Sequence, residues 1–249
     1  MKFSSIKVAM SGLMLAGGLA VSGSASALAI KTSALDANSN LQFSAGALKN
    51  FTDSGIQIGA LGNAKSAGAA GAYILPITKI DVSLGWNLRV KPISGESLGS
   101  ALSVRKGNDL FALANFAVDY RSKSVTADVF GFGVQPRLSV FSFEEKTPLT
   151  IKLRGLGLSM NQTLGNLKLT DAASASFADM LDLSTGLTAI LKGLDFGTIT
   201  INATTAPRGS QLPLKGAFTA AMLVPEPSTY AMMALGLFGI GVVARRKVR

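Results

Sequence analysis

Apolar and polar positions alternate along most of the middle of the chain, which predicts β-strands. An apolar residue at every second position puts one face of a strand into a core. The expected strands cover residues 73–84, 86–91, 101–105, 110–120, 124–130, 134–143, 149–160 and 196–203. Turn-forming residues separate them at 94–95, 106–109, 121–123, 131–133 and 146–148. Short strands with turns about every ten residues favour an antiparallel sandwich or barrel.

Two other segments have the spacing of three and four that is typical of helices. In residues 30–61 this spacing occurs at Leu41, Ala45, Leu48 and Phe51. Gly55 is expected to end that helix, and the small residues of 59–71 indicate a flexible loop. A second helix is expected over 170–183, with Thr170 as its N-cap. Residues 211–223 are expected to form a last strand or a linker. The predicted fold is mainly β with one or two helices.

The composition limits the chemistry that the chain can perform. The 249 residues are 48% hydrophobic and 15% charged, which is typical of a globular protein with membrane segments added. Neither Cys nor His occurs, so disulfides are excluded, and the commonest general base and metal ligand are missing. We therefore expect no cofactor, no metal site and no catalytic residues, and we expect that the protein is not an enzyme.

The net charge of +10 is partly concentrated at the two ends of the chain. The basic residues between the ends are spread along the predicted strands and turns, without a Lys/Arg run or an aromatic-interleaved stripe. Nucleic acid is therefore not an expected partner. A mildly basic surface instead favours an acidic polysaccharide or an anionic lipid.

The N-terminus has the three parts of a secretory signal peptide. Lys2 and Lys7 precede an apolar run over 8–21, and Ala25-Ser26-Ala27 forms a small-residue cleavage site. Cleavage is expected after Ala27, with Ala29 as the second choice. The alternative is an uncleaved membrane anchor, for which the apolar run is short.

The C-terminus has a second three-part pattern. Pro225-Glu226-Pro227 is expected to remain extended, because proline interrupts regular structure. An uncharged apolar segment over 230–244 follows and predicts a short transmembrane helix. The basic cluster of Arg245, Arg246 and Lys247 is expected to remain in the cytoplasm, which places the body outside the inner membrane.

This tail resembles the PEP-CTERM sorting signal, which exosortase recognises in Gram-negative bacteria that make extracellular polysaccharide. Pro225-Glu226-Pro227 matches the signature tripeptide, and the apolar helix and basic cluster match the other two parts. The resemblance implies processing near the tripeptide; a plain membrane anchor is the alternative. The expected parts of the chain are a signal peptide over 1–27, an exported β-rich domain over 28–223 and the sorting tail over 224–249.

Candidate sites in the body each have an ordinary structural explanation beside the functional one. Glu144-Glu145 would point to opposite faces of a strand and so would not flank one bond. Asp179 and Asp182 are three apart on a predicted helix, but two carboxylates do not complete a Ca²⁺ shell. A Ser-Lys pair, as at Ser122-Lys123, could act as nucleophile and base, but these two residues have the composition of a hairpin turn.

The order of elements over about residues 73–200 is similar to that of HtaA-type haem-uptake domains. Matching stretches are 73–78, 107–110, 113–119 and 137–141, followed by the late helix and Phe196-Gly197-Thr198. The resemblance implies a haem pocket with Tyr ligation and a supporting His. Tyr73 and Tyr120 are the tyrosines of the body, and ordinary strand aromatics are the alternative interpretation.

We therefore expect an exported, non-catalytic protein of the cell envelope or extracellular matrix, associated with exopolysaccharide in a biofilm. Its expected processing enzymes are signal peptidase and exosortase, and its C-terminal helix would hold it in the membrane. A surface binding module for haem or another hydrophobic ligand is the alternative. A hydrolase would require two carboxylates in one cleft, drawn from Asp81, Glu96, Asp109, Asp119 and Asp128.

Overall fold

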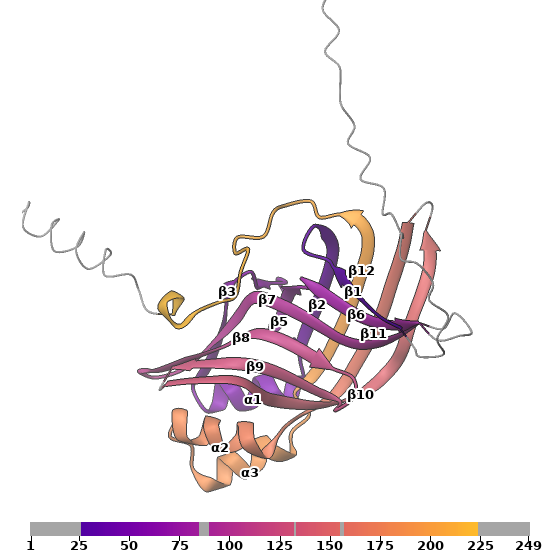
Figure 1. Cartoon of the computed structure of the whole chain (residues 1–249). Coiled ribbons are helices and arrows are strands. Elements are labelled where there is room, and N and C mark those ends of the chain that lie inside the picture. The colour runs from indigo at the N-terminus through magenta and orange to yellow at the C-terminus, as the bar shows by residue number, and fades with distance from the viewer. Residues whose placement is uncertain (1–25, 85–89, 132, 155–156, 224–249) are drawn as a thin grey trace, which may run out of the picture.

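The computed structural model describes residues 26–84, 90–131, 133–154 and 157–223, and within them one antiparallel sheet of twelve strands forms the body (Figure 1). The strands are β1 (Ser26–Lys31), β2 (Leu35–Phe43), β3 (Ile56–Gly62), β4 (Lys65–Ser66), β5 (Ala72–Pro76), β6 (Lys79–Leu84), β7 (Val90–Lys106), β8 (Asp109–Asp119), β9 (Ser124–Gly131), β10 (Gly133–Arg154), β11 (Gly157–Leu169) and β12 (Gly197–Pro207). Their order is β1-β6-β7-β8-β9-β10-β11-β12-β2-β5-β4, and β3 pairs with β7 outside this path.

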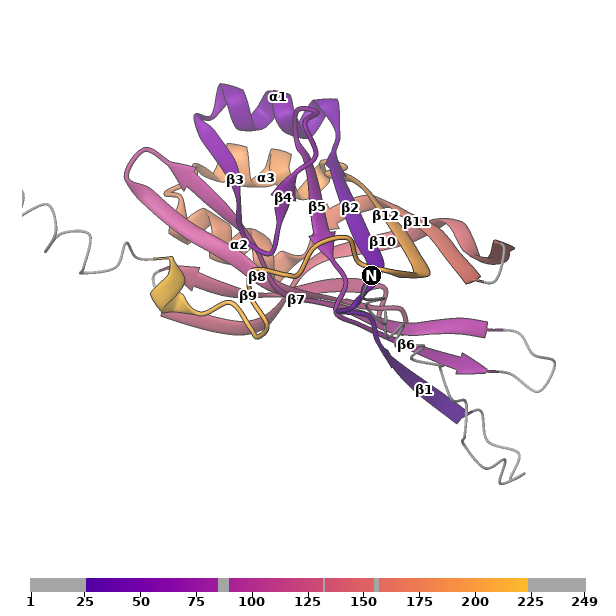
Figure 2. The ribbon, with the colours of Figure 1, turned by 90° about the horizontal axis from the view of Figure 1, so that it is seen from above.

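The sheet curls into a half-barrel whose two ends approach each other at β7 (Figures 1 and 2). The first half of β7 pairs with β6 and its second half pairs with β3. In the link between β5 and β6, the backbone N–H of Thr78 donates to the carbonyl of Glu96 over 2.8 Å, next to the Lys79–Glu96 pair of β6 and β7. The strand β5 itself also contacts β7. This arrangement confirms the predicted mainly-β, antiparallel, barrel-type fold.

Three helices lie together at one end of the half-barrel: α1 (Ala45–Asp53), α2 (Asp171–Met180) and α3 (Thr185–Gly193) (Figure 1). Each begins at a Ser or Thr whose side-chain oxygen accepts a backbone N–H of the first turn, and Thr170 is the N-cap of α2 as predicted. The helix α3 was not predicted, and a short 3₁₀ turn, η1 (Ala220–Met222), follows later.

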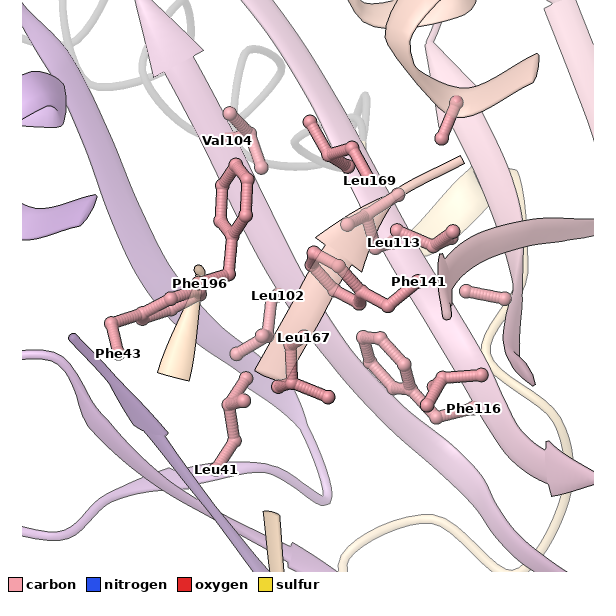
Figure 3. Packing of buried hydrophobic residues seen from close by; sticks show 14 of the residues in the cluster. Leu41, Phe43, Leu102, Val104, Leu113, Phe116, Phe141, Leu167, Leu169 and Phe196 are labelled. Atoms are coloured by element: carbon pink, nitrogen blue, oxygen red, sulfur yellow. The ribbon is translucent and has the colours of Figure 1, made fainter. Parts of the chain in front are cut away.

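The main core fills the concave side of the sheet and the space beneath the helices. Phe111, Leu164 and Leu167 are completely buried in it. Figure 3 shows apolar side chains from β2, β7, β8, β10 and β11 pointing toward one another. Phe141 packs against Phe196 with ring centroids 5.4 Å apart. Burial of each such side chain stabilises the fold by about 1.5–3 kcal/mol.

The predicted helix over residues 30–61 is wrong except at α1. Its first part forms β2, in which Ala37, Ser39, Leu41 and Phe43 are buried and alternate with more exposed residues. Pairing with β12 and β5 buries that alternating face, which a local helical spacing does not reveal. The expected flexible loop over 59–71 is also partly wrong, because it contains the end of β3 and all of β4.

Two predicted turns, at 94–95 and 146–148, are wrong because strands run through them. The strand β7 has 17 residues and β10 has 22. Register shifts in the pairing with β6 and β11 occur at these places, so the turn-forming residues are accommodated as β-bulges. The remaining predicted turns, at 106–109, 121–123 and 131–133, do separate strands.

Residues 1–25 of the predicted signal peptide lie outside the described residues, whereas Ser26 and Ala27 are the first residues of β1. The predicted sorting tail over 224–249, with its transmembrane helix over 230–244, also lies outside the described residues. Within the described part of the chain, no helix has the length and apolar character needed to cross a membrane.

Candidate functional site

A basic groove of about 790 Å³ lies where the first strands meet the segment that follows β12. We call that segment, Arg208–Leu223, the strap; it leaves β12 and crosses the top of the sheet in Figure 1. Four cationic side chains and one carboxylate, Glu96, line the groove, the cations being Lys31, Lys79, Arg208 and Lys215. Hydroxyl and amide groups lie between them, on Ser33, Thr78, Ser210 and Gln211.

Arg208 holds the start of the strap against β2 and the turn before it. Its guanidinium donates to the carbonyl of Ala37 at 2.7 Å, to Asn38 Oδ1 at 3.0 Å and to the carbonyl of Ser33 at 3.2 Å. These partners are neutral oxygens, so the positive charge of Arg208 is not cancelled by a bonded carboxylate. Partial burial lowers the pKa of Arg208 from its ordinary value, although a guanidinium remains charged at neutral pH.

Lys79 lies between two acids of the predicted set. Its Nζ is 2.8 Å from Asp81 and 3.9 Å from Glu96. The hydrogen bond to Asp81 and the charge of Glu96 raise the pKa of Lys79, while hydrogen bonds from Lys79 and Ser94 lower the pKa of Asp81. Lys79 and Asp81 are therefore both ionised at neutral pH. The two nearby carboxylates largely balance the positive charge of Lys79.

Lys31 and Lys215 add two further positive charges to the groove. Both side chains are exposed, and neither forms an ion pair among the residues that the structure describes. They come from opposite ends of the folded chain, from β1 and from the strap. Sequence reasoning missed this site, because residues 211–223 alone indicated only a strand or a linker.

The interior of the half-barrel contains two small apolar cavities, of about 40 and 50 Å³. Leu41, Phe116 and Phe141 line both of them, and Figure 3 shows these three side chains within the core. The second cavity continues toward the helices, where Phe177 and Leu191 line it. Ligand pockets of drug or cofactor size are about 300–1,000 Å³, so neither cavity has room for haem in this conformation.

The two tyrosines considered as haem ligands are both engaged in hydrogen bonds. The hydroxyl of Tyr73 donates to the carbonyl of Ile58 at 2.8 Å, and the hydroxyl of Tyr120 donates to Gln162 Oε1 at 2.7 Å. Burial raises the pKa of both phenols. Neither ring lines either interior cavity.

The predicted acidic sites do not assemble into one cluster. Glu144 accepts a hydrogen bond from Asn166 and Glu145 accepts one from Gln162. Asp179 lies beside a separate surface hollow of about 330 Å³, while the backbone carbonyl of Asp182 accepts from a lysine. Within the described ranges, no three His, Cys, Asp or Glu side chains are grouped to hold a metal ion.

The remaining candidate residues, Asp119, Ser122 and Asp128, form hydrogen bonds in turns and at strand edges. Asp119 accepts the backbone N–H of Arg121 at 2.8 Å in the turn after β8. In the same turn, Ser122 Oγ lies 2.7 Å from Ser124 Oγ. Asp128 accepts from the side chain of Asn115 and from a backbone N–H. These contacts are typical of turns and strand edges.

Comparison with known proteins identifies the tail. A family model described as the PEP-CTERM protein-sorting motif matches residues 223–247, a range that contains Pro225-Glu226-Pro227 and Arg245, Arg246 and Lys247. No curated protein matches the chain. Among solved structures, the haem-binding protein HtaB from Corynebacterium glutamicum is similar at 11% identity and a TM-score of 0.40, over 72% of this chain and 96% of that one. The chain thus carries a PEP-CTERM sorting motif, which implies an exported protein that exosortase processes during membrane-anchored sorting in a Gram-negative bacterium.

Proposed function

We propose that the exported body is a non-catalytic protein of the cell envelope or extracellular matrix that binds acidic exopolysaccharide in the basic groove. The observation that carries this proposal is the lining of the groove, in which four cationic side chains face one carboxylate. A groove lined mainly by one sign of charge raises the local concentration of a ligand of the opposite sign. Its volume of about 790 Å³ is enough for several sugar residues of a polymer.

The chemistry of the groove favours uronate or similarly charged sugars. Lys31 and Lys215 would face carboxylates, and Ser33, Ser210 and Gln211 would exchange hydrogen bonds with sugar hydroxyls. No aromatic side chain is among the groove's lining residues, so recognition would depend on charge rather than on ring stacking. Binding of this kind weakens as salt screens the charges.

The composition supports a role without catalysis. The chain lacks both His and Cys. Of the acids considered for a hydrolase, Asp81 and Glu96 approach each other, but Lys79 lies between them as an ion-pair partner. An ionised carboxylate held in this way lacks the raised pKa of a general acid.

The test is a binding measurement with the purified full chain and two polymers. Polygalacturonate is the acidic probe and dextran is the neutral control, each titrated by calorimetry at low and at high NaCl concentration. We expect polygalacturonate to bind at low salt and to lose affinity at high salt, whereas dextran does not bind. Equal binding of both polymers, or no binding of polygalacturonate at low salt, would contradict the proposal.

A second candidate function is binding of a small hydrophobic ligand inside the half-barrel. The two adjoining apolar cavities favour it, and Leu41 forms part of the wall between them. The substitution Leu41→Ala would join the cavities, at an expected cost of about 2–5 kcal/mol in unfolding free energy. If the interior is a ligand site, the wild-type protein binds an apolar fluorescent probe and Leu41→Ala binds it more tightly. Haem is titrated in parallel, and an absorbance shift would extend the candidate to haem.

A further inference from the structure

The strap is tied to the body by two asparagines far away in the sequence. Asn63 is completely buried. Its side-chain amide pairs with the backbone of Leu214 as the backbone of a neighbouring strand would. Its Oδ1 accepts the backbone N–H of Leu214 at 2.7 Å, and its Nδ2 donates to the carbonyl of Leu214 at 2.9 Å. A third bond, from Nδ2 to the carbonyl of Leu98 at 3.1 Å, fixes the amide against β7.

Asn115 makes the same kind of pair with Phe218. Its Oδ1 accepts the backbone N–H of Phe218 at 2.8 Å, and its Nδ2 donates to the carbonyl of Phe218 at 3.0 Å. The amide is held in place by Asp128 Oδ2 at 2.8 Å and by the backbone N–H of Gly99 at 3.1 Å. Asn115 has a φ of 53°, a left-handed conformation that Asn adopts more readily than most residues.

The body is shaped to receive the strap closely. Phe218 is 2% exposed, and its ring lies 6.0 Å from that of Phe130. Gly62 and Gly99 both have positive φ, and a Cβ on Gly99 would come within 2.6 Å of Asn63 Nδ2 and of the carbonyl of Gly216. A Cβ on Gly62 would come within 3.1 Å of the Phe218 ring. Side chains at either glycine would displace the strap.

This docking shortens the chain available between the body and the sorting motif. Pro225 is seven residues after Phe218, and the apolar segment that begins at Tyr230 is twelve residues after it. At about 3.3–3.6 Å per extended residue, the anchored body can lie at most roughly 40 Å from the membrane. If the strap detached back to Arg208, the same limit would rise to roughly 75 Å.

We infer that Asn63 and Asn115 are positioning residues for tail processing: by docking the strap they hold the sorting motif close to the body and slow its access to the processing enzyme. A membrane-embedded protease must take the peptide around its cleavage site in extended form, away from the bulk of its substrate. Residues 220–222 form η1, and Leu223 packs against the cluster that contains Phe218. When the strap detaches, residues 220–223 are freed and the chain between the body and the apolar segment becomes longer.

The test follows tail removal from the full chain in its native host by pulse labelling and intact mass. Asn115→Gly removes both strap hydrogen bonds, together with the side-chain bonds to Asp128 and Gly99, and accommodates the positive φ. A second variant inserts a flexible six-residue Gly-Ser linker between Met222 and Leu223, which lengthens the tether and leaves both asparagines in place. Thr219→Ala is the matched control, because that side chain is exposed on the strap and forms no cap hydrogen bond.

We expect the tail of Asn115→Gly to be removed about tenfold faster than that of the wild type. The loss of the two strap hydrogen bonds raises the fraction of molecules with a detached strap by about that factor. The linker variant should also be faster, and Thr219→Ala should match the wild type. Hydrogen exchange on purified chains should show faster exchange over 212–222 in Asn115→Gly with unchanged protection of β8 and β9. Unchanged or slower tail removal in Asn115→Gly, with exchange showing a detached strap and an intact body, would overturn the inference. Tail removal from the linker variant at the wild-type rate would also overturn the inference. This variant changes no residue of the body, so a folding defect would not explain that result.

Discussion

The hydroxyl of Tyr120 donates a hydrogen bond to the side-chain oxygen of Gln162 over 2.7 Å, which joins the end of β8 to β11 across the concave side of the sheet. Gln162 is 2% exposed, and its Nε2 donates to Glu145 at 3.2 Å. The Tyr120 ring meets Phe143 edge-on, with centroids 5.8 Å apart. Tyr120 is thus part of a buried polar link between strands that are not neighbours in the sheet.

The first prediction concerns the stability that this link provides. Tyr120→Phe leaves the buried oxygen of Gln162 without its donor, which is expected to cost about 1–3 kcal/mol in unfolding free energy. Urea denaturation of the purified protein measures it. The double variant Tyr120→Phe/Gln162→Leu replaces both partners with apolar groups and should recover part of the loss. If the single variant is as stable as the wild type, the bond contributes nothing to the fold.

The second prediction is a loss of stability at alkaline pH. Burial, with a smaller effect of the Glu145 charge, raises the pKa of Tyr120 above the ordinary value of about 10. Above that ordinary value the unfolded chain loses the phenol proton while the folded chain keeps it, so stability is retained below about pH 10 and falls as the pH rises further. Denaturation midpoints between pH 8 and 11 should therefore drop for the wild type. Tyr120→Phe should show a smaller drop, and an identical drop would assign the effect to other groups.

The third prediction concerns the basic groove. The double variant Lys31→Ala/Lys215→Ala removes two exposed groove lysines that form no ion pair among the described residues. It should weaken polygalacturonate binding by about 3- to 30-fold at low salt, if each exposed charge contributes up to about 1 kcal/mol. The control is Lys152→Ala, an exposed lysine on β10 that does not line the groove. Equal weakening by the control would mean that the polymer binds to the surface charge as a whole.

The fourth prediction concerns processing of the N-terminus. Cleavage after Ala27 removes the first two residues of β1 and leaves Leu28–Lys31 paired with β6, in register with Val82–Lys79. The intact mass of the exported protein should correspond to a chain that begins at Leu28. Ala27→Leu removes the small residue that the cleavage site requires and should block the step. A wild-type chain that retains Met1 would mean that the N-terminus is an anchor.

The same mass measurement tests the other end of the chain. A released form that ends near Pro225–Pro227 is expected from exosortase processing of the sorting motif. A membrane-bound form that still carries Arg249 would mean that the tail serves as a plain anchor. The proteins from the membrane and extracellular fractions are therefore compared separately.

Local patterns predicted some elements well and others poorly. Thr170 is the N-cap of α2, because capping depends on a side chain and the N–H groups a few residues away. The predicted helix over 30–61 is correct only at α1, because β2 becomes a strand by pairing with β12 and β5, which lie outside that segment. The turn signal at 146–148 is absorbed into β10, where its pairing with β11 shifts register.

The sequence by itself determined the alternating strands, the antiparallel β class and the sorting tail, because periodicity and short motifs are properties of neighbouring residues. Only the tertiary structure decided that the sheet curls until β3 and β5 reach β7. It also brought Lys31 and Lys215 into the lining of one groove, and Asn115 beside Phe218, 103 positions away. Such contacts arise when hydrophobic burial and strand pairing close long loops, and they leave no local pattern from which either partner can be recognised.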